Sequence, residues 1–174
     1  MSNKTRARLD LTARLVIVLW AVTFAHHLYG GLRFDSPGRV GAAVAFTAIL
    51  GLTLWLWRLG ASRTWARRTY LATVVGFWVV LLGLYEGGYN HALYVVLRWL
   101  APGLADRAYA TDSDALLSSD VFFQGTGVLT LVAALGVAAT LPQALRAARA
   151  GTAPPHPAEV SEVRGGDRVT NHHA

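Results

Sequence analysis

The sequence predicts an all-α membrane protein in which four transmembrane helices form an antiparallel bundle in up-down-up-down order. The 174-residue chain is 53% hydrophobic and only 15% charged, whereas a soluble domain carries about a quarter charged residues. The charged residues gather between four apolar stretches. Each stretch has roughly 18–25 residues, enough to cross a hydrocarbon core of about 30 Å at about 1.5 Å per helical residue.

The four predicted spans are Leu11–Leu32, Val40–Trp57, Tyr70–Tyr89 and Val121–Leu145. The first span follows a basic N-terminus, as a signal peptide does, but it is long and no A-x-A-like cleavage site follows it. We therefore expect a retained signal anchor. Short connections favour a bundle over residues 1–150. Residues 151–174 are rich in Pro, Gly and charge and are expected to form a disordered cytoplasmic tail.

The stretch after the third span has two interpretations. Gly87 and Gly88 could end the helix at Tyr89 or bend it. The following "ALYVVLRWLAPG" then continues the helix or forms a short helix at the membrane interface, which suits an arginine beside a tryptophan. A polar, acidic loop follows, and Ser118, Ser119 or Asp120 is expected to cap the fourth helix.

Small residues predict close helix packing in the second and fourth spans. These residues are Gly41, Ala42, Ala45, Ala48, Gly125, Ala134, Gly136 and Ala138.

The distribution of cationic residues predicts the orientation. Twelve of the sixteen Lys and Arg residues lie in the N-terminal segment, the second connection and the C-terminal segment. The other four are Arg33, Arg39, Arg98 and Arg107, in two connections that also contain most of the aspartates. Because cytoplasmic loops carry the excess of Lys and Arg, both termini are predicted to lie in the cytoplasm, with the helices in the cell (inner) membrane.

Composition also excludes several classes of function. The chain has no cysteine, so disulfides, thiolate metal sites and cysteine nucleophiles are excluded. A net charge of +6 would suit a nucleic-acid-binding protein, but the arginines flank apolar segments, which membrane orientation explains better. We therefore expect the lipid bilayer as partner, no nucleic acid, and a homo-oligomer or a larger membrane complex as the possible assemblies.

Few ionisable side chains fall within the spans, and they are predicted to lie at one depth. They are His26 and His27 in the first span and Glu86 in the third, with His91 just beyond it. Counted from the cytoplasmic ends, His26 lies about 22 Å and Glu86 about 24 Å along their helices. Tyr29, Tyr89, Asn90 and Gln124 are the polar neighbours expected to support this cluster in the outer leaflet.

Helical spacing supports the cluster in part. Glu86 and Asn90 are four residues apart and share a helix face. His26 and His27 are about 100° apart on an α-helix, which predicts that only one of them faces Glu86. We favour His27, which shares its face with Thr23 and two glycines. His91 would lie about 140° from Glu86 unless the helix changes at its glycines.

An unpaired charge within a membrane is costly, so Glu86 must pair, bind a cation or be protonated. One hypothesis is a divalent transition metal (Zn, Cu, Fe or Mn) held by His26, His27, Glu86 and His91. The other main hypothesis is a structural or accessory subunit whose polar cluster fixes helix packing.

Other functions are compatible with the same residues. His27 and His91 could ligate haem in a redox protein, or Glu86 and His27 could exchange protons in a transport component. No catalytic motif stands out, so an enzyme is the less expected class. The tail residues His156, His172 and His173 are interpreted as solvated side chains.

Overall fold

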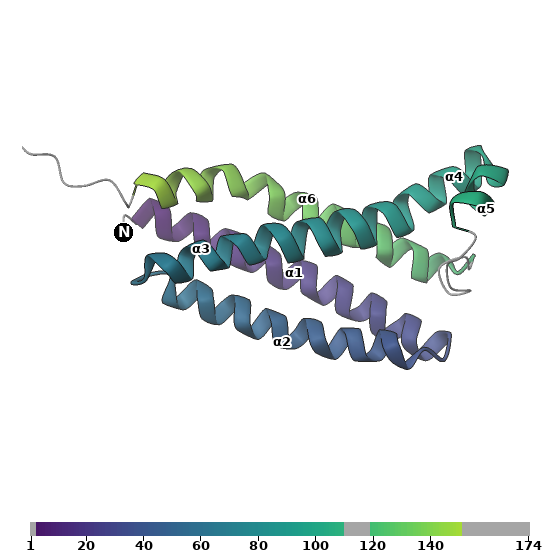
Figure 1. Cartoon of the computed structure of the whole chain (residues 1–174), viewed down its shortest axis with the longest axis horizontal. Coiled ribbons are helices and arrows are strands. Elements are labelled where there is room, and N and C mark those ends of the chain that lie inside the picture. The colour runs from purple at the N-terminus through teal and green to yellow at the C-terminus, as the bar shows by residue number, and fades with distance from the viewer. Residues whose placement is uncertain (1–2, 110–118, 151–174) are drawn as a thin grey trace, which may run out of the picture.

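The computed structural model describes the backbone of residues 3–109 and 119–150 and the side chains of residues 10–109 and 119–146, all in helices and short turns. The helices are α1 Asn3–Arg33, α2 Pro37–Leu59, α3 Thr64–Thr73, η1 Val74–Leu93, α4 Tyr94–Leu100, α5 Pro102–Ala108 and α6 Val121–Ala150. They pack lengthwise in an elongated bundle (Figure 1). The expected tail, 151–174, lies outside the described residues.

Four helical stretches in this part of the chain are long and apolar enough to cross a membrane. They are Asp10–Arg33, Pro37–Leu59, Thr64–Leu100 and Val121–Arg146. All four predicted spans lie at these positions, so the prediction of an all-helical chain with four such helices is confirmed.

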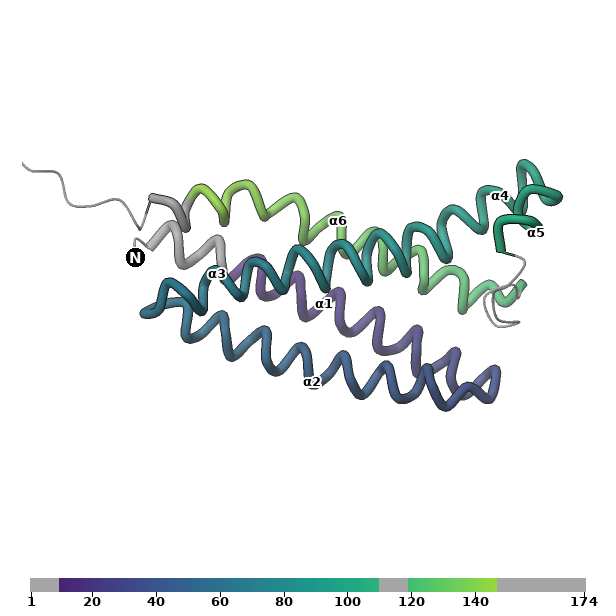
Figure 2. Tube along the Cα trace, in the orientation of Figure 1, coloured from purple at the N-terminus to yellow at the C-terminus, as the bar shows by residue number. Residues whose placement is uncertain are grey.

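The third span is longer than the predicted Tyr70–Tyr89. Elements α3, η1 and α4 form one continuous rod (Figure 2), so ending the helix at Tyr89 was wrong. Gly87 does not stop the helix. Its missing side chain lets η1 approach α6, since a Cβ atom there would lie 2.5 Å from the backbone nitrogen of Leu131.

The long helices meet in a defined order. α1 packs against α2 and α6, α6 packs against η1, and α2 packs against α3. The α1–α2 turn and the start of α6 lie at one end of the bundle, and the α2–α3 turn lies at the other end, beside the end of α6 (Figure 1).

Most of the buried residues on α1 and α6 recur at alternating spacings of four and three, which makes one continuous buried seam on each helix. On α1 these residues are Thr12, Val16, Leu19, Thr23, His26 and Gly30, and on α6 they are Phe123, Gly127, Thr130, Ala134, Val137, Leu141 and Ala144. At one end of the interface, the Thr12 and Thr140 hydroxyls are hydrogen bonded at 2.9 Å.

The small residues predicted to pack closely do so only in part. A Cβ atom at Gly83 would lie 2.2 Å from the Cβ of Ala134, so this pair forms a close helix contact. Gly41, Gly125 and Gly136 have no such neighbour within 4 Å among the described residues. Gly125 and Gly136 lie outside the buried seam of α6. The sequence pattern alone did not separate such positions from the packed ones.

The ends of the membrane-length helices follow from local chemistry. Ser36 is extended and is followed by Pro37 in the first turn of α2, a position that proline tolerates because that N–H has no helical partner. At the start of α6, the carboxylate of Asp120 accepts a hydrogen bond from the backbone N–H of Phe123 at 2.8 Å. Asp120, one of the three predicted candidates, therefore caps α6. Ser118 lies outside the described residues.

Candidate metal centre

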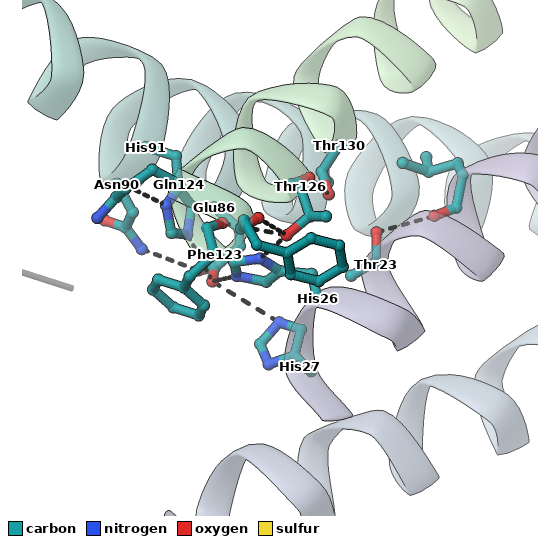
Figure 3. A network of polar contacts seen from close by, with 12 residues as sticks. Thr23, His26, His27, Glu86, Asn90, His91, Phe123, Gln124, Thr126 and Thr130 are labelled. Carbon is teal, nitrogen blue, oxygen red and sulfur yellow. Dashed lines mark hydrogen bonds and ion pairs between the residues drawn. The ribbon is translucent and has the colours of Figure 1, made fainter. Parts of the chain in front are cut away.

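The side chains of three histidines converge on one oxygen of Glu86 (Figure 3). The Nε2 atom of His26 lies 3.7 Å from Oε1 of Glu86, and those of His27 and His91 each lie 3.6 Å from it. The two neighbouring histidines come from α1, whereas Glu86 and His91 come from η1. The prediction that the four ionisable groups form one cluster is confirmed.

Both neighbouring histidines face the carboxylate, so the expectation that only one can do so was wrong. The rings of His26 and His27 are perpendicular, with an interplanar angle of 90° and centroids 5.3 Å apart. Their Nε2 atoms reach the same oxygen from different directions because side-chain rotation offsets the angle between their Cβ atoms. His26 belongs to the buried seam of α1, and the preference for His27 alone missed it.

The position of His91 also differs from the α-helical expectation. Residues 74–93 are wound as a π-helix, in which the repeating hydrogen bond joins residues five apart. Glu86 and His91 are five residues apart, so this winding brings them to one face. The expected separation of about 140° holds only for an α-helix. Single π-helical turns inside α-helices are frequently found at functional sites.

Three polar residues orient the side chains of the cluster through hydrogen bonds. The Nδ1 atom of His91 lies 2.8 Å from Oε1 of Gln124, and that of His26 lies 3.0 Å from the Thr126 hydroxyl. The side-chain amide of Asn90 donates a hydrogen bond of 2.8 Å to Oε2 of Glu86. Gln124 and Thr126 both lie on α6, so that helix fixes one histidine from each of the other two helices.

These partners determine which ring nitrogen carries hydrogen. An amide oxygen can only accept, so Nδ1 of His91 donates to Gln124. The Thr126 hydroxyl donates to the backbone carbonyl of Phe122 at 2.8 Å, which leaves its oxygen to accept from Nδ1 of His26. In their neutral forms, both rings therefore present an unprotonated Nε2 to Glu86.

The cluster is closed off by aromatic and backbone contacts. His26 and His91 are fully buried, and Phe123 stacks on His26 with ring centroids 4.4 Å apart. The ring of His91 lies directly against Gly127, where a Cβ atom would be 2.1 Å from Cγ of the ring. Among the described residues, the Nε2 atoms of the three histidines have no hydrogen-bond partner.

The other predicted polar neighbours point elsewhere. Tyr29 donates a hydrogen bond of 2.9 Å to Asp120 at the start of α6, and Tyr89 stacks on Tyr85 at 5.9 Å. Neither belongs to the cluster. The tail histidines His156, His172 and His173 lie outside the described residues.

Sequence reasoning missed Thr126 and Phe123. Their contacts with the histidines could not be read from the chain, because these contacts depend on the register between α1 and α6. The only sequence signal was their position within one turn of the predicted Gln124.

Asp120 carries a second, smaller polar network outside the spans. The backbone N–H of Phe123 and the hydroxyl of Tyr29 donate to this carboxylate, and Arg33 lies 3.6 Å from it. These donors hold the pKa of Asp120 below its ordinary value of 3.8, with the backbone N–H as the largest cause. The network ties the end of α1 to the start of α6, next to the histidines.

Comparison with known proteins adds no family. No protein-family model matches the sequence, and neither a curated protein nor a solved structure matches it significantly. The function must therefore be inferred from the cluster itself.

Proposed function

We propose that this chain is an integral membrane protein that binds one divalent transition-metal ion between His26, His27, His91 and Glu86. The ligand atoms of His26, His27 and Glu86 lie within 4.8 Å of one another, a spacing that a single ion can bridge. His91 is equally close to the same carboxylate oxygen, at 3.6 Å.

The observation that carries the proposal is the direction of the lone pairs. His26 and His91 each donate Nδ1–H to a residue of α6, so their neutral rings turn lone pairs toward Glu86. A carboxylate also presents lone pairs. These atoms cannot hydrogen bond to one another, and they lie in a buried place where repulsion is poorly screened. A cation between them converts the repulsion into attraction.

The surrounding contacts match those of known metal ligands. A metal-binding histidine characteristically donates its second ring N–H to a carbonyl, a carboxylate or water, which fixes the ring and raises its basicity. The side-chain carbonyl of Gln124 accepts this hydrogen bond from His91. The side-chain amide of Asn90 donates a hydrogen bond that orients Glu86. Imidazole and carboxylate donors suit Zn²⁺, Fe²⁺, Mn²⁺ or Cu²⁺.

Two of the alternative functions use the same residues differently. In the structural alternative, the cation is a proton on one of the histidines, and the ion pair only fixes helix packing. Haem between His27 and His91 is disfavoured, because Oε1 of Glu86 lies 3.6 Å from both Nε2 atoms and occupies the place of the macrocycle.

The proposal includes an up-down-up-down arrangement in the cell membrane with both termini in the cytoplasm. The pairings Thr12–Thr140 and His26–Thr126 support opposite directions for α1 and α6, since one number rises as the other falls. The excess of Lys and Arg near the termini and the second connection supports the orientation. The cluster then lies in the outer leaflet.

The test is metal analysis with an optical spectrum on the full chain purified in detergent. We expect the wild type to bind one metal ion per chain and to show no haem absorption band. Glu86→Gln should lose the metal ion. Asp106→Asn is the matched control, because this carboxylate is exposed and pairs with Arg98 at the surface. Wild-type protein that takes up no zinc, iron, manganese or copper would support the structural alternative and refute the proposal.

A further inference from the structure

The three histidines of the cluster are not held equally. His26 and His91 each have a hydrogen-bond partner on α6 for Nδ1. His27 has none: among the described residues, both of its ring nitrogens are buried without a hydrogen-bond partner. Its ring packs against the ring of Phe46 on α2 in a T-shaped arrangement, with centroids 4.9 Å apart and an interplanar angle of 84°.

We propose that His27 is the exchangeable ligand of the centre, and that a small nitrogen or oxygen donor can take its place on the metal. This inference rests on the proposed function. The fixed set is then His26, His91 and Glu86, and the position of His27 is where an external ligand binds.

The difference in hydrogen bonding makes this exchange easier for His27 than for its neighbours. Release of His26 or His91 from a metal would leave a ring that is still anchored to α6 and still aimed at the carboxylate. Release of His27 breaks no hydrogen bond, and its ring contacts Phe46 through apolar contacts that allow rotation. His27 is also the one histidine of the three with measurable exposure, at 7% against 0% for the others.

The fixed set has the composition of a reactive metal site. Two histidines and one carboxylate hold the catalytic zinc of several hydrolases and the iron of non-haem oxygenases, both of which keep an open position for water or substrate. Closed structural sites instead keep four firmly held protein ligands. The missing anchor on His27 therefore favours a centre that admits a ligand over one that only stabilises the fold.

The size of the external ligand follows from the enclosure. Phe46 lies against His27, and Phe123 covers His26, so the space that opens is about that of one imidazole ring. The class of ligand is therefore a small monodentate donor. Azide and imidazole are suitable probes.

The test uses full-length protein loaded with Co²⁺, whose visible spectrum reports the number and type of its ligands. Azide added to the wild type should change the spectrum in a saturable way. His27→Ala should keep Co²⁺ with an affinity lowered by about tenfold or less, whereas His26→Ala and His91→Ala should lose about a hundredfold or more. Imidazole should restore the wild-type spectrum to His27→Ala and not to the other two variants.

The outcomes separate this inference from the function on which it rests. A wild type that binds no Co²⁺ overturns both. A wild type that binds Co²⁺ but whose spectrum does not change with azide overturns the inference and leaves the metal site standing. The azide titration needs no variant, so a folding defect in His27→Ala does not decide the result.

Discussion

Gly127 lies behind the cluster, and Gly127→Ala is predicted to disrupt metal binding without removing a ligand. A Cβ atom at this position would lie 2.1 Å from Cγ, 2.4 Å from Cδ2 and 2.6 Å from Nδ1 of His91. Ordinary contact begins at 3.4 Å. The ring and α6 must therefore separate by about 1.3 Å at the closest atom pair.

A displacement of that size affects both ends of the imidazole. The hydrogen bond from Nδ1 to Gln124, 2.8 Å long, would stretch beyond the useful range. Nε2 would also leave its place, and a metal site tolerates only about 0.2 Å of error in ligand distance. Loss of such a supporting contact lowers metal affinity by about 10–100-fold.

Gly127→Ala should lower the free energy of unfolding, whereas replacing a glycine by alanine in a helix interior ordinarily raises it. Alanine in a helix interior is favoured over glycine by about 1 kcal/mol. Overpacking against His91 costs about 1–3 kcal/mol, so the net effect is a loss of up to about 2 kcal/mol. Gly125→Ala and Gly136→Ala meet nothing within 4 Å in the described part of the chain and should show only the gain.

The assay is a competition titration against a chelator, paired with thermal unfolding of the same detergent-solubilised samples. Gly127→Ala should bind metal at least about tenfold more weakly than wild type, and both control variants should match wild type. Equal metal affinity in Gly127→Ala and Gly125→Ala would refute the packing argument, because it would mean that His91 can move without consequence for the site.

The remaining predictions concern the α6 cap and the membrane orientation. Asp120→Ala should lower the free energy of unfolding by about 1 kcal/mol near neutral pH, whereas Asp106→Ala, at an exposed ion pair, should have little effect. Because the folded-state pKa of Asp120 is lowered, its contribution is present above 3.8 and lost as the pH falls through the lowered value. Thermal unfolding across this range should show the wild type and Asp120→Ala converging in acid, and a constant difference would contradict the assignment. Reporter fusions should place both termini in the cytoplasm, and an external C-terminus would contradict the four-span topology.

The sequence was sufficient for the helices and for the depth of the cluster. Hydropathy and length identify a membrane-length helix without knowledge of its neighbours, and all four predicted spans lie within such helices, although the third helix is longer than predicted. Depth depends only on the rise per residue, so His26 and Glu86 could be placed in one layer before any packing was known.

Rotation about the helix axes required the tertiary structure. On an α-helix, His91 would turn away from Glu86, and the sequence left open whether the helix changes at Gly87 and Gly88. The π-helical winding of η1 brings residues five apart together, and the two glycines alone did not predict this type of winding. The angle between His26 and His27 was also misleading, because rotation about side-chain bonds lets both rings reach one atom.

What the sequence by itself determined is therefore the presence of four membrane-length helices and the level along them at which the ionisable groups lie, because both follow from local composition and helical rise. What only the tertiary structure decided is the partnership of those groups across helices. Gln124 and Thr126 fix the ring nitrogens of His91 and His26, and His27 is left without such a partner among the described residues. These contacts depend on the register between α6 and its neighbours, which is set by how the buried seams fit together.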